Sequence, residues 1–264
     1  MAYQPTLLFF GAGANVGAAS VALFKNKGYK VASVARTVRD EVKAHSDLVL
    51  TANFNDPSCL KSIFEQVEKE LGIPSVIVYN AYSWSRPSDD NDPLSTSVEG
   101  VQNDFAVNSI SLYAAAQEAI KGFEKLPQEV KKTFIFTGNR GSTVITPDIF
   151  LLAWTKSASW YLIQTLVATT LFQSKGYRFY FADERCPDGK GMRYISGSAH
   201  AELYVELAEK EDQGPPLATF VRGKGYVAFD EDERASLPVV WRSELANEEY
   251  GAPGTEEWNY GKGT

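Results

Sequence analysis

Cysteine, histidine and methionine are all scarce in this chain, with two of each among 264 residues. Cys59 and Cys186 lie far apart, and their spacing is typical neither of a metal site nor of a disulfide framework. His45 and His200 have no metal-type partner beside them, and we interpret both as surface or helix residues. The sequence therefore predicts no metal site, and its two unpaired cysteines favour a reducing, cytoplasmic location.

Positive charge is in deficit, and long hydrophobic runs are missing. The chain has 26 Lys and Arg against 33 Asp and Glu, which gives a formal net charge of -7. No basic stripe is available for a phosphate backbone, so a nucleic-acid partner is excluded. No apolar run approaches the ~18 residues that cross a bilayer, and the N-terminal segment lacks the charged start of a signal peptide. We expect a small-molecule ligand and no membrane partner.

Short β-branched or aromatic runs alternate along the chain with longer segments of helical spacing. Such alternation leads to right-handed crossovers and a parallel sheet covered by helices. The predicted fold is α/β, a single doubly wound Rossmann-type domain with a parallel sheet flanked by helices on both faces. Strands are expected at residues 6–10, 29–36, 47–53, 75–80, 133–138 and 177–182, with a weaker one near 225–229, and helices at 15–27, 57–71, 98–123, 149–174 and 198–210.

We expect one domain over residues 1–264. Its cofactor half spans about 1–125 and its substrate half about 126–230, and an irregular tail rich in acidic residues, Gly and Trp follows at about 231–264. Pocket specificity is expected from the polar loop at 83–97 and from the region 184–200, although neither has a pattern that identifies a substrate.

A glycine-rich loop, GAGANVG, follows directly after the first predicted strand. Gly11 and Gly13 allow a tight turn and close approach to a pyrophosphate, and Gly17 allows the helix to pack closely on the strand. The helix that begins at Asn15 and Val16 offers free N–H groups and a partial positive charge. Loops also collect glycine for conformational reasons, but this position after the first strand of a βαβ unit predicts dinucleotide binding.

The second predicted strand ends near Arg36, where a dinucleotide site selects its ribose. An acidic residue there would hydrogen-bond a 2′-hydroxyl, whereas a guanidinium matches the geometry of a 2′-phosphate. A solvated arginine at a strand end is the alternative interpretation. The sequence thus predicts NADP(H) in preference to NAD(H).

The order of these motifs resembles the short-chain dehydrogenase/reductase superfamily over about residues 5–210. Gly11 and Gly17 match the first and last glycines of the family's T-G-x-x-x-G-x-G loop, while Asn15 replaces the middle glycine and Phe10 the threonine. The resemblance is carried more by the order of the motifs than by any one of them.

Further matches follow along the chain. Asn53 and Phe54 fall where the family's Asp–Val pair contacts adenine, with Asn in place of Asp. Asn80 and Ala81 match the middle of the family's N-N-A-G segment. Asn108 matches the helical asparagine that holds a proton-relay water in the family.

The catalytic segment departs from the family pattern. Lys156 matches the lysine that lowers the pKa of the acid tyrosine and holds the nicotinamide ribose, but Leu152 occupies the tyrosine position four residues earlier. None of the thirteen tyrosines precedes a lysine by four residues, so a change of register does not restore the motif. Thr137 and Gly138 stand where the family has its substrate-orienting serine. Arg140 is a candidate to stabilise negative charge or bind a carboxylate, with a solvent-facing loop arginine as the alternative.

The resemblance thus implies two sets of site residues. The catalytic candidates are Lys156, Asn108 and Arg140. The cofactor-binding candidates are Gly11, Gly13, Asn15, Val16, Gly17, Arg36, Asn53, Phe54, Asn80, Ala81 and Lys156.

Three functions remain open at this point. The first is an NADPH-dependent reductase acting on a C=N, C=C or C=O bond of a small organic or biosynthetic intermediate, where hydride transfer to an iminium ion needs no acid. The second is a cyclase of secondary metabolism that keeps NADP(H) as a structural wall, and the third is an NADP-binding pseudoenzyme or sensor. The helices at 98–123 and 149–174 match those of the family's dimer contacts, which implies a homodimer or homotetramer.

Overall fold

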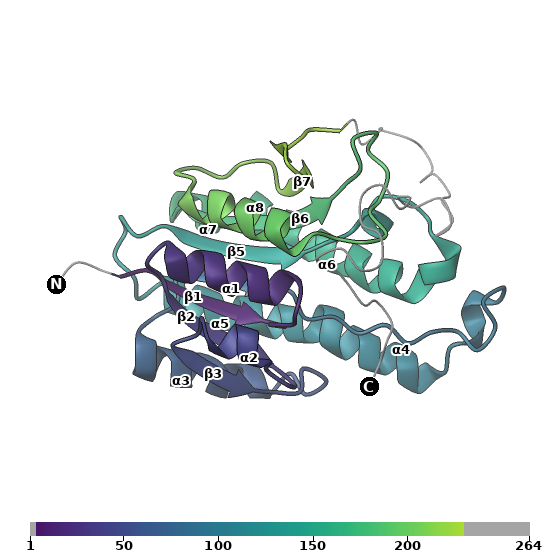
Figure 1. Ribbon diagram of the computed structural model, residues 1–264, viewed down its shortest axis with the longest axis horizontal. Coiled ribbons are helices and arrows are strands. Elements are labelled where there is room, and N and C mark those ends of the chain that lie inside the picture. Colours follow the sequence, from purple (N-terminus) through teal and green to yellow (C-terminus); the bar gives the residue numbers. More distant parts are fainter. Residues whose placement is uncertain (1–3, 230–264) are drawn as a thin grey trace.

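Seven parallel strands and one antiparallel edge strand form the sheet of the protein (Figure 1). The computed structural model describes residues 4–229, and the strand order is β3-β2-β1-β4-β5-β6-β7-β8. The strands are β1 (Thr6–Phe10), β2 (Lys30–Ala35), β3 (Leu48–Thr51), β4 (Val76–Tyr79), β5 (Lys132–Thr137), β6 (Tyr177–Glu184), β7 (Leu217–Val221) and β8 (Gly225–Tyr226). The order reverses between β1 and β4, and ligands of doubly wound sheets bind outside the carboxyl ends of the strands at such a point.

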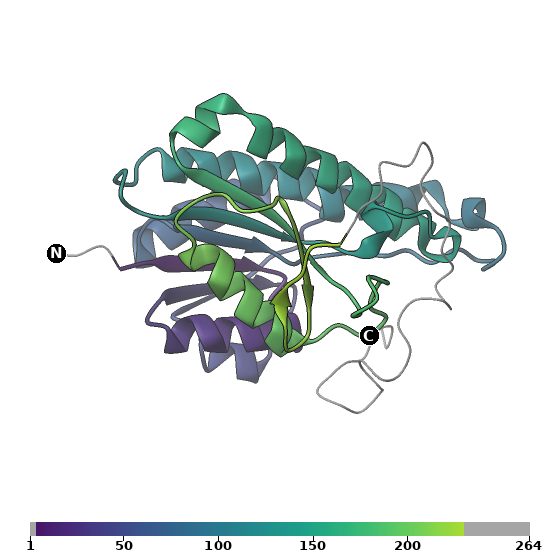
Figure 2. The same cartoon turned by 90° about the horizontal axis from the view of Figure 1, so that it is seen from above.

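Helices cover both faces of the sheet, as Figure 2 shows for α1 and α8 on one side and α5 and α6 on the other. Leu7 and Phe9 of β1 belong to the core beneath α1 and α8, whereas Leu8 and Phe10 belong to the core beneath α3, α5 and α6. The helices are α1 (Val16–Asn26), α2 (Asp40–Lys43), α3 (Cys59–Leu71), α4 (Val98–Phe105), α5 (Ser111–Phe123), α6 (Phe150–Ala168), α7 (Thr170–Ser174) and α8 (Gly197–Glu209). β1 is buried on both faces, which explains why the four residues after Thr6 are all apolar.

The predicted fold class is confirmed, and two long predicted helices are each interrupted. The helix expected at 98–123 contains a π-helical segment, η2 (Ala106–Ile110), between α4 and α5. The helix expected at 149–174 ends at Ala168, because Thr169 has an extended backbone with ψ of 108°. Short 3-10 turns precede these helices or lie between strand and helix, at Pro93–Ser95, Arg140–Ser142 and Pro147–Ile149.

The carboxyl-terminal part of the sheet differs most from the prediction. The sixth strand continues two residues beyond its predicted end, through Asp183 and Glu184, because β7 pairs with it there. β7 itself was not predicted, since a short apolar run has no periodicity that separates a strand from a helix. The strand expected at 225–229 is the short antiparallel β8.

The structure does not test two further expectations, the irregular tail and the two halves of the domain. The tail at about 231–264 lies outside the described residues, and the division into a cofactor half and a substrate half stays a prediction. Among the helices of residues 4–229, none is long and apolar enough to cross a membrane.

Gly138→Ala is expected to destabilise the protein by about 1–3 kcal/mol, because overpacking a filled core displaces its side chains. A Cβ at Gly138 would lie 1.9 Å from Cε1 of the fully buried Phe181 ring, which packs against Phe136 and Trp160. The free energy of unfolding in urea measures the effect. Gly214→Ala is the matched control, since its nearest neighbour would lie at an ordinary 3.6 Å. Equal stability of the two variants would contradict this packing.

Candidate functional site

The loop after β1 passes very close to the chain that leaves β4. Gly11 has φ of +78°, and a Cβ there would lie 2.4 Å from the Ala81 nitrogen. A Cβ at Gly17 would lie 2.6 Å from the carbonyl carbon of Ala12, so α1 begins directly against the loop. Gly13, in contrast, has no atom within 4 Å of the place where its Cβ would be. The first and last glycines are therefore required by packing, while the space beside Gly13 is open to a ligand.

The first turn of α1 has unused N–H groups. Ala18 donates to a loop carbonyl, but no hydrogen bond within the described part of the chain engages the N–H of Val16 or Gly17. The Asn15 side chain does not cap the helix and donates instead to the Ile195 carbonyl at 3.0 Å. Because the amino end of a helix carries a partial positive charge, a phosphate group fits here.

A chain of hydrogen bonds crosses the switch point between β1 and β4. The Asn80 amide donates to the Gly11 carbonyl at 2.9 Å, and the Thr137 hydroxyl donates to the Asn80 amide oxygen at 2.9 Å. Since Thr137 has only one hydroxyl proton, Tyr204 is the donor in the 2.6 Å contact between the two hydroxyls. Burial raises the pKa of Tyr204, which keeps this phenol protonated. The network joins α8 to the glycine loop.

Two of the expected adenosine-side residues lie at the carboxyl ends of neighbouring strands. Arg36 directly follows β2 and is exposed, and Asn53 follows β3 and is also exposed. The Asn53 side-chain oxygen accepts the N–H of Asn55 at 3.1 Å and so shapes a turn. Phe54 is buried and packs edge-on against Phe10 at a centroid distance of 5.8 Å, which makes it a core residue.

Lys156 is a buried cation at the end of β5. Its Nζ donates to the Thr137 carbonyl at 2.5 Å and lies 5.1 Å from the centre of the Phe136 ring. Burial lowers the pKa of Lys156 to about 8, and the nearby Asp183 carboxylate acts in the opposite sense. No other hydrogen bond of this ammonium is formed within residues 4–229, so two of its three N–H donors are available to ligand hydroxyls. One turn earlier, Leu152 is buried and has no proton to give.

Asn108 lies in the π-helical segment, and the protein itself uses its whole amide. The amide oxygen accepts the Ser83 N–H at 2.8 Å, and the amide nitrogen donates to the Ser83 carbonyl at 2.8 Å and the Thr155 hydroxyl at 2.9 Å. Asn108 therefore fastens the loop after β4 to α6. Its expected role in holding a relay water stays a prediction.

Arg140 begins the 3-10 turn after β5, and its Nη1 donates to the Thr143 hydroxyl at 3.0 Å. A second guanidinium, that of Arg185, approaches the same hydroxyl at 3.5 Å. Arg185 is buried and forms a 2.6 Å ion pair with the buried Asp183. The structure thus brings Arg140 to the rim of a charged cluster that was not predicted. The available signal was the charged run of residues 183–185, which directly follows the apolar run 177–182.

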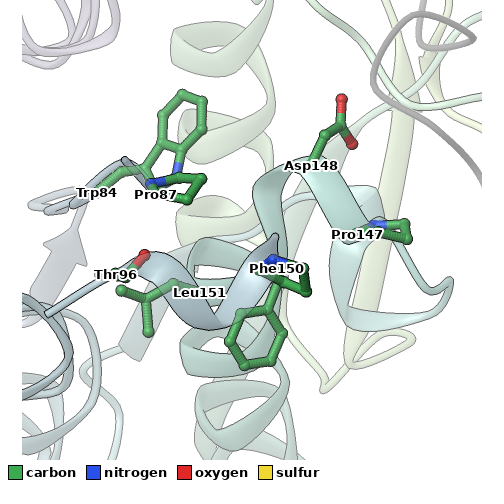
Figure 3. A pocket seen from close by; sticks show the side chains of 8 residues that line it. Trp84, Pro87, Thr96, Pro147, Asp148, Phe150 and Leu151 are labelled. Atoms are coloured by element: carbon green, nitrogen blue, oxygen red, sulfur yellow. The ribbon is translucent and has the colours of Figure 1, made fainter. Parts of the chain in front are cut away.

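A small hollow lies between the loop after β4 and the start of α6. Trp84 and Pro87 line one side of it, and Pro147 and Phe150 lie across from them (Figure 3). Its cavity volume of about 10 Å³ is far below the ~300 Å³ at which ligand pockets begin. The loop at 83–97 does contribute to this wall, but the hollow admits only a small part of a ligand.

Comparison with known proteins identifies the family. No protein-family model matches the chain. Over 245 residues the chain is 38% identical to the short chain dehydrogenase/reductase dmxR12 of Cryptosporiopsis sp. (strain 8999), and the match covers 89% of this chain and 98% of that protein. The chain belongs to the short-chain dehydrogenase/reductase family. The resemblance expected from the motifs is thereby confirmed.

Solved structures show that short-chain dehydrogenases/reductases share this fold. A variant of a Serratia marcescens family member gives a TM-score of 0.68 at 18% identity, covering 83% of this chain and 96% of that one. NADH-dependent reductase A1-R' complexed with NAD gives 0.65 at 14% identity, with 78% and 88% covered. An NADPH-bound short chain oxidoreductase from Pseudomonas aeruginosa PAO1, described as containing an atypical catalytic center, gives 0.58 at 16% identity, with 70% and 73% covered. At these identities the likeness concerns the fold alone.

His200 of this short-chain dehydrogenase/reductase is not a surface residue. It lies on α8 as expected but is buried, and its Nδ1 lies 2.7 Å from the Ser196 carbonyl. Burial lowers the pKa of His200 to about 4, so the ring is neutral and Nδ1 carries the proton. The Glu184 carboxylate lies 3.5 Å away, and burial raises the pKa of Glu184 to about 7. Of the two alternatives given for His200, surface or helix, the helix is the one that the structure shows, and the burial of the ring between α8 and β6 was not predicted.

Lys156→Met is expected to remove a pH-dependent contribution to stability. Since burial lowers the pKa of Lys156 from 10.5 to about 8, the folded chain releases this proton at a lower pH than the unfolded chain does. Between those values the lysine makes the free energy of unfolding rise with pH, by at most about 1.4 kcal/mol per pH unit. Urea unfolding of the unchanged protein and the variant from about pH 7 to pH 10 measures this difference.

The matched control is Lys61→Met, which removes an exposed lysine on α3. The control is expected to keep a constant stability difference over the same range, because this side chain is exposed to solvent in the folded protein. A constant difference for Lys156→Met as well would show that the lysine is not desolvated.

Proposed function

We propose that this chain is an NADP(H)-binding reductase that transfers hydride to a small organic or biosynthetic intermediate without a tyrosine acid. The surroundings of Lys156 carry the proposal. Its buried ammonium has N–H donors available beside the Thr137 carbonyl, while the buried Leu152 fills the position of the missing acid. The coenzyme, when bound, supplies the hydride, and the protein contributes orientation, charge and exclusion of water.

A phosphorylated dinucleotide fits the residues at the carboxyl edge of the sheet. The open space at Gly13 and the N–H groups of Val16 and Gly17 suit a pyrophosphate. The exposed Arg36 suits a 2′-phosphate, which favours NADP(H) over NAD(H), and Lys156 suits the hydroxyls of the nicotinamide ribose. The NAD and NADPH complexes of structures with the same fold support a nicotinamide dinucleotide in general.

The absence of a phenol at position 152 limits the substrate chemistry. Hydride transfer to an iminium carbon yields a neutral amine, so no acid is needed. Reduction of an activated alkene or a ketone leaves a carbanion or an alkoxide, and water has to supply that proton. Arg140 would stabilise such a negative charge but is a poor acid, because the pKa of a guanidinium exceeds ~12. A C=N substrate therefore fits this site better than a C=C or C=O substrate.

A second candidate function is NADP(H) binding without redox turnover, as a pseudoenzyme or as a cyclase. The observation that favours it is the internal use of the polar groups near the site. Thr137 is held between Asn80 and Tyr204, and the Asn108 amide is fully engaged with Ser83 and Thr155. Neither group has a free proton for a substrate in this arrangement.

A second copy of the chain is the expected protein partner. α5 and α6 lie side by side on one face of the sheet (Figure 2). Large apolar side chains remain exposed on these helices and on the adjoining π-helical segment, namely Ile110, Tyr113, Trp154 and Tyr161. Apolar groups in this arrangement fit a homodimer or homotetramer contact in the cytoplasm.

Arg36→Glu is expected to weaken NADPH binding by about 10- to 100-fold, because a charge-assisted contact of about 1.5–3 kcal/mol is replaced by repulsion. NADH binding should change much less, since NADH has no 2′-phosphate. Tryptophan fluorescence titration measures both affinities. Lys61→Glu, which reverses an exposed charge on α3, is the control. Equal losses for both nucleotides would contradict the assignment of Arg36.

Leu152→Tyr is expected to create NADPH-dependent ketone reduction, because it places a phenol one helical turn from Lys156. Leu152→Phe is the matched control, with the same ring and no proton. Consumption of NADPH absorbance against imines, enones and ketones measures turnover. The unchanged protein is expected to act on imines in their protonated, iminium form. NADPH that binds and is never consumed by the unchanged protein, together with ketone reduction by Leu152→Tyr, would reject the reductase and support the second candidate.

A further inference from the structure

Four side chains hold the backbone of residues 194–196, which directly precede Gly197, the first residue of α8. The hydrogen bonds run from Arg222 Nη2 to the Tyr194 carbonyl (3.4 Å), from Asn15 Nδ2 to the Ile195 carbonyl (3.0 Å), from the Ser196 N–H to Glu184 Oε2 (2.7 Å), and from His200 Nδ1 to the Ser196 carbonyl (2.7 Å). A loop held in this way at consecutive residues has a fixed position. We call residues 194–197 the brace.

The brace fits against Asn15 without spare room. A Cβ at Gly197 would lie 2.4 Å from the Asn15 side-chain oxygen and 2.7 Å from its carbonyl oxygen. Asn15 stands where the family loop has its middle glycine, and here its side chain occupies the space that Gly197 leaves. Position 15 has a side chain where the family has a glycine, and the space for that side chain is provided by Gly197, which lies 182 residues later.

Glu184 holds the brace from the side of β6. Its side chain is inaccessible to solvent, and Oε2 accepts the Ser196 N–H. Oε1 makes no hydrogen bond within the described residues, since the Arg222 Nε is 3.6 Å away. A buried carboxylate with only one good hydrogen bond is costly for stability. The one hydrogen bond that Glu184 does accept comes from the brace, through the Ser196 N–H.

We propose that Glu184 is a positioning residue for the dinucleotide loop, acting through the brace and Asn15. The N–H groups of Val16 and Gly17 directly follow Asn15, so a brace that moves would carry them out of line with a pyrophosphate. The inference rests on the proposed function, because it explains how the N–H groups that are proposed to bind phosphate are held in position. A change in β6 or α8, which belong to the expected substrate half, would therefore alter the affinity for the nucleotide.

A double-mutant cycle on NADPH affinity tests this coupling. Asn15→Gly and Glu184→Ala are each expected to weaken binding about tenfold, the equivalent of one lost hydrogen bond, and the double variant also about tenfold. Residues that do not touch and act separately would give about a hundredfold instead. A hundredfold loss in the double variant, or unchanged affinity in Asn15→Gly, overturns the proposal.

Two further variants keep the test decisive if Glu184→Ala does not fold. Glu184→Gln retains an oxygen acceptor for the Ser196 N–H and should bind NADPH within about twofold of the unchanged protein. Gly197→Ala drives a methyl group into Asn15 and should weaken binding about tenfold, whereas the control Gly214→Ala should not. A tenfold loss in Glu184→Gln, or none in Gly197→Ala, overturns the proposal.

The measurement also separates this inference from the proposed function. If the unchanged protein binds no NADPH, the proposed function fails. Free energies of unfolding for Asn15→Gly, Gly197→Ala and the double variant then still report on the brace, because they need no nucleotide. Coupled losses in those energies support it, and additive losses overturn it.

Discussion

The structure of the site depends on one steric constraint, the near contact of two backbones where β1 and β4 leave the sheet. A side chain at Gly11 would overlap the Ala81 nitrogen, so only glycine permits the crossing. The Asn80 amide then ties the two segments together through the Gly11 carbonyl. α1 begins just after this crossing, and the proposed pyrophosphate contact uses the N–H groups of Val16 and Gly17 in its first turn.

Three charged side chains are buried where β6 ends, namely Asp183, Glu184 and Arg185. Asp183 and Arg185 compensate each other at 2.6 Å, which offsets much of the cost of desolvating them. Glu184 has a poorer set of partners, and burial raises its pKa to about 7. Arg185 donates to the Gly189 carbonyl, and Glu184 accepts the Ser196 N–H just before α8, so both side chains also hold the chain that follows β6.

The chemistry of the site is constrained by what surrounds Lys156. An apolar Leu152 removes the phenol that would lower the barrier to protonating an alkoxide. The lysine is kept, although its burial is unfavourable for a charge and lowers its pKa to about 8. Under the proposed function, this cation would bind ribose hydroxyls and the reaction would not depend on a phenol.

The sequence by itself determined the layers of the fold, and it predicted part of the candidate site. Alternating apolar runs predicted the first six strands, and the glycines, Lys156 and Leu152 predicted a nucleotide site without a tyrosine acid, because these signals are local. It could not give β7, the π-helical turn at Asn108, or the burial of His200 and Glu184. Those depend on contacts between distant segments, such as Asn15 with Ile195, which lie 180 residues apart. Only the tertiary structure decided which polar groups meet, since hydrogen bonding between remote side chains leaves no period in the sequence.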